Sequence, residues 1–286
     1  MELAQVKIVT DSTADLPLEI REKLGIRMVP LKVHFGKETF LDSVDIISSE
    51  FYTKLSQSQE LPTTSQPSPV DFMEVYKELC DQPDTSVISI HLSSALSGTY
   101  QSAMLAKSLL DNQTNVVLVD SKSACYGLGL LVIAAAEAAQ AGKSVDEIQA
   151  LVQDLRNKTR IYFILDTLEY LYKGGRIGKA SAMFGSLLNI KPILTLDDGG
   201  EVDSVDKVRG HKKAVKRIIE LLQKDFEGQR INVGIGHSQS RDGAEEIYHL
   251  INEQFQVNQH SYTDLGPVIG THTGPGTLAV FVTPAT

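Results

Sequence analysis

The sequence is poor in cysteine, and its two cysteines, Cys80 and Cys125, form no metal-binding or disulfide pattern. There is no C-x-x-C spacing, and no histidine cluster accompanies either residue. A disulfide framework and a structural zinc site both need several such residues at fixed spacings. We therefore expect two buried thiols and neither a bound metal nor a cofactor.

Positive charge and long apolar runs are also scarce. The formal net charge is -9 and the pI is near 5.3, which disfavours nucleic acid as a partner because a phosphate backbone would be repelled. The longest apolar stretch, residues 128–139, is too short and too interrupted to span a bilayer, and the N-terminal residues lack the basic and apolar regions of a signal peptide. We expect a cytoplasmic protein.

The common catalytic signatures are missing as well. The segment KGGRIGKA at 173–180 departs from the P-loop pattern, since only three residues separate Gly174 from Gly-Lys and alanine replaces the final Ser or Thr. GHSQS at 236–240 lacks the last glycine of G-x-S-x-G. What remains at 173–180 is Arg176 on a glycine-flanked turn, suited to pair with a carboxylate of a ligand or of the protein itself.

What the sequence does contain is an alternation of short β-branched runs with helical patterns. With 286 residues, this favours an α/β fold of two domains, which we place at 1–158 and 159–286. The first domain should hold a mainly parallel sheet, whereas two β-compatible runs flanking Asp-Asp-Gly-Gly at 197–200 predict a hairpin and a mixed sheet in the second. The expected strands include KIVTDS, MVPLKVHF, VISIHL, VVLVDS and runs around SYTDLGPVIGTH and TLAVFVT. The expected helices include 69–80, 97–110, 124–141 and 145–157. Capping boxes at Ser68 and Ser144 begin two of these helices.

Hydroxyl side chains cluster where strands end. The segment HLSSALSGTY at 91–100 offers four hydroxyl groups and a tyrosine around Gly98, and the proline-rich segment 61–69 carries Thr64 on a stiff loop. Ligands of open parallel sheets bind at the carboxyl ends of the strands. Helix capping is the alternative use for such residues, but capping needs only one hydroxyl. A third loop, the glycine-rich turn at 270–276, presents His272 either to a ligand or to the protein interior.

Taken together and in this order, seven motifs that run through the whole chain resemble those of the DegV family of bacterial fatty-acid-binding proteins, the FakB-type carriers. The motifs are VTDSTADL at 9–16, TSQP at 64–67, IHLSSALSGTY at 90–100, DSKS at 120–123, KGGRI at 173–177, IKPI at 190–193 and HTG at 272–274.

The resemblance implies a long-chain fatty acid buried between two α/β domains. By motif, Thr64, Ser97 and the Gly98 amide would hold the carboxylate, and Arg176 and His272 would complete the polar network. Candidates for the tunnel wall are the 124–136 helix, Phe184 and Leu188.

The resemblance also implies a partner, a fatty acid kinase that phosphorylates the bound carboxyl group for phospholipid synthesis. Arg209 is similar in position to a surface arginine that the family uses toward its kinase, and transient contact with a membrane is expected of such a carrier. The alternative to this non-enzymatic carrier is a serine-dependent enzyme that acts on a small acyl or phosphorylated substrate through Ser97 or Ser238 and His272.

Overall fold

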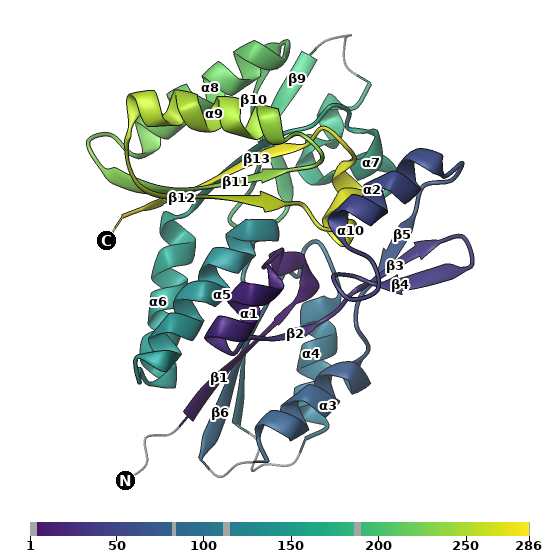
Figure 1. Cartoon of the computed structure of the whole chain (residues 1–286), viewed down its shortest axis with the longest axis vertical. Helices are drawn as coiled ribbons and strands as arrows, with labels where there is room; N and C mark the ends of the chain where they lie inside the picture. Colours follow the sequence, from purple (N-terminus) through teal and green to yellow (C-terminus); the bar gives the residue numbers. More distant parts are fainter. Residues whose placement is uncertain (1–4, 82–83, 111–114, 186–189, 286) are drawn as a thin grey trace.

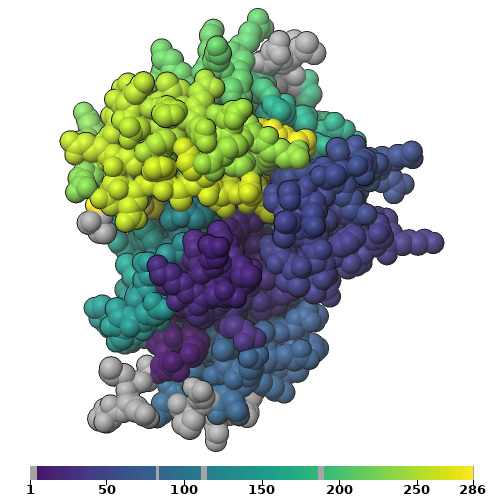
Figure 2. Space-filling model, viewed as in Figure 1, coloured from purple at the N-terminus to yellow at the C-terminus, as the bar shows by residue number. Residues whose placement is uncertain are grey.

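The computed structural model describes residues 5–81, 84–110, 115–185 and 190–285. Figure 1 shows most N-terminal residues in the lower part of the view and the C-terminal residues in the upper part, with residues 32–65 at the right beside both. Each part has its own sheet, and the space-filling view in Figure 2 shows the two parts packed directly on each other.

The N-terminal sheet has four parallel strands in the order β2-β1-β6-β7. All of β6 is buried, as expected for a strand covered by helices on both faces. Helices α3 and α4 pack on one face, and α1, α5 and α6 belong to the core on the other. The elements are β1 (Gln5–Asp11), η1 (Ser12–Ala14), α1 (Leu18–Leu24), β2 (Arg27–Val29), α3 (Pro69–Leu79), β6 (Thr85–His91), α4 (Thr99–Ser108), β7 (Asn115–Asp120), α5 (Cys125–Gln140) and α6 (Val145–Lys158).

Both predicted capping boxes are confirmed. The Ser68 hydroxyl accepts a hydrogen bond from the Asp71 N–H at 3.3 Å, and the Asp71 carboxylate accepts one from the Ser68 N–H at 2.8 Å. Ser144 and Glu147 make the same reciprocal pair at the start of α6. These caps satisfy backbone donors that a helix start leaves without partners.

A small antiparallel sheet, β4-β3-β5, was not predicted. The run MVPLKVHF, predicted as one strand, forms two strands in different sheets, since β2 ends at Val29 and β3 begins after Pro30 and Leu31. Proline cannot donate to a strand ladder, which explains the break. The stretch 61–69, predicted as a loop, contains the short strand β5. The bounds are β3 (Lys32–Phe35), β4 (Glu38–Leu41), α2 (Ser48–Gln57) and β5 (Thr63–Ser65).

In the described residues the C-terminal sheet has six strands in the order β10-β9-β8-β13-β11-β12. It is mixed, since β11 and β12 pair in parallel and the other described pairs are antiparallel. The predicted hairpin is confirmed by the antiparallel pairing of β9 with β10. Helices α8 and α9 cover the outer face (Figure 1). The elements are β8 (Arg160–Ile164), α7 (Glu169–Lys173), η2 (Gly178–Met183), β9 (Ile190–Leu196), β10 (Val202–Arg209), α8 (His211–Asp225), β11 (Arg230–His237), α9 (Arg241–Gln254), β12 (Gln256–Asp264) and β13 (Leu278–Pro284).

The sequence prediction was wrong between β12 and β13. Residues 267–273, expected to belong to a closing strand and a glycine-rich turn, form the helix α10 (Pro267–Thr273), and His272 lies in its last turn. Pro267 occupies the first helical position, where its missing N–H costs nothing. Helix α10 leaves the C-terminal sheet and packs against α2 and the N-terminal core.

These observations confirm the predicted fold class, an α/β protein with a parallel N-terminal sheet and a mixed C-terminal sheet. The boundary between residues 158 and 159 stays a prediction. Both cysteines are free. Cys80 is only partly buried, so the expectation was wrong there, whereas burial raises the pKa of the Cys125 thiol well above its usual value. In the described part of the chain, no helix has the length and apolar character needed to cross a membrane.

Candidate functional site

An apolar cavity lies between the two sheets. The volume of this cavity, together with the space on its open side, is about 810 Å³. Residues of both halves of the chain line it, and most of them are aliphatic or aromatic. The lining consists of Leu31, Thr64, Leu92, Leu96, Ser97, Ala124, Cys125, Ile161, Phe163, Leu171, Arg176, Leu196, Val202, Leu265, Val268, Ile269, His272, Thr273, Thr277, Ala279 and Phe281.

Four predicted site residues, Thr64, Ser97, Arg176 and His272, line this cavity together. They come from four separate places in the fold: strand β5, the loop before α4, the turn after α7 and the end of α10. The fold therefore brings together polar side chains that are up to 208 positions apart in the sequence. The roles that the family resemblance implies for them stay predictions.

His272 is fixed by Thr64. The Thr64 hydroxyl lies 2.8 Å from Nε2 of His272, whereas Nδ1 is buried and has no hydrogen-bond partner in the described structure. Burial, and then the charge of Arg176, lowers the pKa of His272 to about 4. The imidazole is therefore neutral at pH 7. Gly174 packs so closely against the ring that any side chain there would overlap Nδ1.

Arg176 brings a positive charge to the cavity, and the described part of the chain places no carboxylate against it. Its Nε donates to the carbonyl oxygen of Leu96 at 3.1 Å and its Nη1 to that of Gly174 at 2.7 Å. No acidic side chain of the described residues forms an ion pair with it. The sequence left two partners open for Arg176, a carboxylate of a ligand and a carboxylate of the protein. The described contacts favour the carboxylate of a ligand.

Ser97 and Gly98 form the start of α4. The Ser97 hydroxyl lies 2.9 Å from that of Thr99 and accepts a hydrogen bond from the Thr99 N–H at 3.3 Å, while Gly98 is the N-cap residue. A Cβ atom at Gly98 would lie 2.7 Å from Nε2 of Gln66, so glycine permits this close approach. The N-terminal end of a helix carries partial positive charge, which suits an anion.

Helix α10, which carries His272, is tied to the N-terminal half. Asp15 accepts a hydrogen bond from the Gly266 N–H at 3.1 Å, and the Ser48 hydroxyl donates to the Leu265 carbonyl oxygen at 3.0 Å. Burial, and then the nearby charge of Asp42, raises the pKa of Asp15 well above its usual value. Burial is also the main reason that the pKa of Asp42 is about 7.

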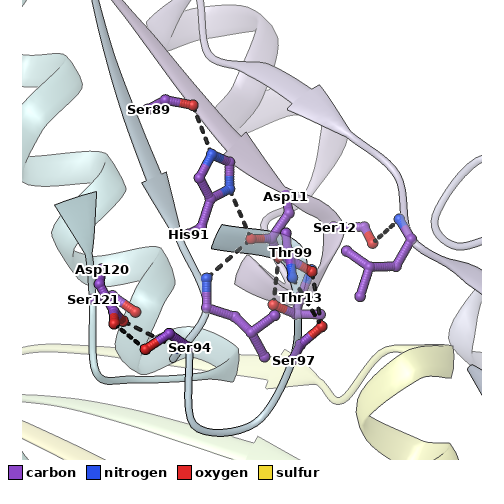
Figure 3. A network of polar contacts seen from close by, with 12 residues as sticks. Asp11, Ser12, Thr13, Ser89, His91, Ser94, Ser97, Thr99, Asp120 and Ser121 are labelled. Carbon is purple, nitrogen blue, oxygen red and sulfur yellow. Dashed lines mark hydrogen bonds and ion pairs between the residues drawn. The ribbon is translucent and has the colours of Figure 1, made fainter. Parts of the chain in front are cut away.

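Sequence reasoning missed a buried chain of polar contacts beside this site (Figure 3). His91 Nδ1 lies 3.0 Å from Asp11, and its Nε2 lies 2.6 Å from the Ser89 hydroxyl, which accepts a hydrogen bond from the Tyr76 hydroxyl at 2.8 Å. Asp11 and His91 end the neighbouring parallel strands β1 and β6, and this shared position was the signal available in the sequence. The order Ser-His-Asp is that of a catalytic triad, but all three side chains are 0% exposed, so no substrate reaches Ser89.

The serine pairs expected of the enzyme alternative do not form in the described structure. His272 bonds to Thr64 rather than to Ser97 or Ser238. Ser238 is fully buried and accepts a hydrogen bond from the Tyr52 hydroxyl at 2.7 Å. Among the described residues there is also no cluster of side chains that could hold a metal ion.

Of the predicted tunnel-wall residues, Ala124 and Cys125 at the start of the 124–136 segment line the cavity. Phe184 does not: the residue is 41% exposed, and its ring stacks on that of Tyr172 with the centroids 3.9 Å apart. Leu188 lies outside the described residues.

An apolar cavity between two α/β halves, with basic and hydroxyl groups at one end, defines a protein that can bind amphipathic anions. Known proteins share this architecture. A family model described as "Uncharacterised protein, DegV family" matches residues 5–285. The chain is 38% identical over 277 residues to Protein DegV of Bacillus subtilis, covering 96% of this chain and 98% of the relative. The chain belongs to the DegV family.

Solved structures agree with this membership. A DegV family protein of Thermus thermophilus, described by its fatty acid binding, superposes with a TM-score of 0.91 at 38% identity, covering 98% of this chain and all of that one. The fatty-acid-binding protein DegV of Bacillus subtilis gives 0.90 at 36% identity, with 99% and 100% coverage. A stearic acid-binding protein of Eubacterium ventriosum gives 0.88 at 27% identity, with 98% coverage of both chains.

Proposed function

We propose that this protein binds a long-chain fatty acid in the cavity between its sheets, with the carboxylate at the end formed by Thr64, Ser97, Gly98, Arg176 and His272. The observation that carries the proposal is the position of Arg176. Its guanidinium borders an apolar cavity, and among the described residues it donates hydrogen bonds only to backbone carbonyl oxygens. Family members of known structure that bind fatty acids support the same ligand.

The energetics of an amphipathic ligand match this division of the cavity. Each buried methylene contributes roughly 0.8 kcal/mol, whereas a buried carboxylate is costly unless it is paired and hydrogen-bonded. The Thr64 and Ser97 hydroxyls and the Gly98 N–H are suitable donors, and Arg176 supplies the compensating charge. Because His272 is neutral, it can accept or donate within this network without adding a second charge.

We further propose that the protein is a non-enzymatic carrier that presents the carboxyl group to a fatty acid kinase. That kinase would use ATP in the cytoplasm to form an acyl phosphate for phospholipid synthesis, and the carrier would exchange its lipid during transient contact with a membrane. Arg209 is exposed at the end of β10 and makes no ion pair with the described residues, so it is available to an acidic surface of the kinase.

Native mass spectrometry of the purified protein, followed by lipid extraction, tests the binding step. We expect one fatty acid per chain, either carried through purification or taken up from added palmitate or oleate. A protein that stays empty in both cases would contradict the proposal.

The kinase step is tested with the loaded protein, a fatty acid kinase and ATP. Arg209→Ala should slow acyl phosphate formation without changing fatty acid affinity. Lys207→Ala, on the same exposed face of β10, is the matched control. Equal rates for wild type and Arg209→Ala would remove Arg209 from the interface.

A further inference from the structure

The cavity has a polar end and an apolar end, ordered along β13 and β8. Thr277, Ala279 and Phe281 line it in turn. The Thr277 hydroxyl donates to the Gly274 carbonyl oxygen at the end of α10, so Thr277 marks the polar end. Phe281 lies four positions further along the chain, about 13 Å away in an extended strand. Ile161 pairs with Phe281 and therefore lies at the apolar end.

A second cavity begins on the other side of Ile161. Together with the space on its open side, this second cavity measures about 1100 Å³. Its lining is mostly polar and charged, unlike that of the first. It includes Lys122, Ser123, Arg156, Asn157, Thr159, Arg160, Thr195, Asp197 and Asp198.

Among the described residues, only Ile161 and Leu196 line both cavities. The antiparallel register that pairs Phe163 with Leu194 places these two residues side by side on β8 and β9. The Thr195 hydroxyl donates to the Ile161 carbonyl oxygen at 2.7 Å, which fixes the backbone at this point. The two apolar side chains thus form a thin partition between an apolar and a polar space.

Gly127 on α5 completes the partition. A Cβ atom there would lie 2.5 Å from Oγ of Ser123, 2.8 Å from Cδ1 of Ile161 and 3.3 Å from Cδ1 of Phe281. Because glycine has no side chain, Ile161 can fill the gap between α5 and β8. Any larger residue at 127 would push Ile161 toward the first cavity.

We propose that the partition of Ile161 and Leu196 stops the methyl end of the acyl chain and so sets the longest fatty acid that the protein binds. The inference rests on the proposed fatty acid site. A chain too long for the first cavity would have to pass into surroundings that contain Lys122 and Arg156. There its last methylenes would gain little from burial and would desolvate charged groups.

The test is a competition among saturated fatty acids. Lipid-free protein is mixed with equal amounts of myristate, palmitate, stearate, arachidate and behenate, and native mass spectrometry measures how much of each is bound. Ile161→Ala should raise the ratio of arachidate to palmitate roughly tenfold over wild type, the effect of about two further buried methylenes. Ile161→Val, which removes only the Cδ1 methyl, should shift the ratio less and in the same direction.

Ile269→Ala is the matched control because Ile269 lines the first cavity alone. It should weaken all the acids without changing their ratio. Gly127→Ala should shift the preference toward shorter acids. An unchanged ratio for both Ile161 variants, or an equal shift for Ile269→Ala, would overturn the partition. Failure of the wild type to bind any of the acids would instead refute the proposed function on which the inference rests.

Discussion

Two groups of polar side chains lie close together in this molecule, and they differ in how fully their hydrogen bonds are used. In the first, Tyr76, Ser89, His91 and Asp11 form an unbroken buried chain in which each polar group has a protein partner. In the second, around the cavity, Nδ1 of His272 is buried without a described partner and Arg176 has no described counter-ion.

The difference separates a structural group from the proposed binding group. Buried polar atoms are nearly always hydrogen-bonded, and those that are not need an explanation. Although the first group has the residue order of a catalytic triad, it is saturated and closed to solvent. The second has unused donors and charge beside an apolar space, which is what a carboxylate ligand requires.

The largest effect, on stability, should come from disrupting the first group, in which each polar group has a protein partner. Asp11→Ala removes the acceptor for His91 and for the N–H groups of Thr13 and Leu92. We expect it to lower the free energy of unfolding by about 3–5 kcal/mol, because several buried donors lose their partner. Urea denaturation measures the loss, and Asp154→Ala, at an exposed helix position, should cost less than about 1 kcal/mol. Equal losses would refute a structural role.

A smaller effect, and on binding rather than stability, should follow from removing a cavity hydroxyl. Thr64→Val or Ser97→Ala should weaken fatty acid binding by about 1.5–3 kcal/mol, the usual contribution of a hydrogen bond to a charged group. Titration calorimetry with palmitate measures it. Thr273→Val serves as the control because that hydroxyl also borders the cavity but bonds to the Ile269 carbonyl oxygen. If the control loses as much affinity, the carboxylate does not lie at Thr64 and Ser97.

The smallest effect is a pH dependence from His272. Its pKa of about 4 in the folded protein lies below the value near 6.5 in the unfolded chain, so the unfolded state takes up a proton first as the pH falls. His272 should therefore reduce stability by about 1 kcal/mol between pH 7 and pH 5.5. The slope should be flatter in His272→Gln, and urea midpoints at several pH values measure it. Identical slopes would show that His272 does not titrate in this way.

Local signals allowed much of the fold to be predicted. The capping boxes at Ser68 and Ser144 involve residues three positions apart, and the β9–β10 hairpin follows from the turn residues between its strands. The parallel sheet follows from the alternation of strands and helices. In each case the deciding interactions lie within a short stretch of chain.

The prediction was wrong where distant contacts decide the structure. The three residues of β5 form a strand only because β3 pairs with them. Helix α10 contains Gly270 and several β-branched residues, which disfavour helix in isolation, and its packing on α2 and the N-terminal core stabilises it. Motif resemblance nevertheless named Thr64, Ser97, Arg176 and His272, which do line one cavity, whereas nothing in their spacing indicated that they meet.

The place of β13 in its sheet has a consequence for how the protein is made. This strand, residues 278–284, lies between β8 and β11, which precede it in the sequence. During synthesis on the ribosome, β8 and β11 therefore stay unpaired with their shared neighbour, β13, which begins more than forty residues after the end of β11. Since β13 also supplies Ala279 and Phe281 to the cavity wall, the nascent chain has no finished cavity until that strand has been translated and inserted.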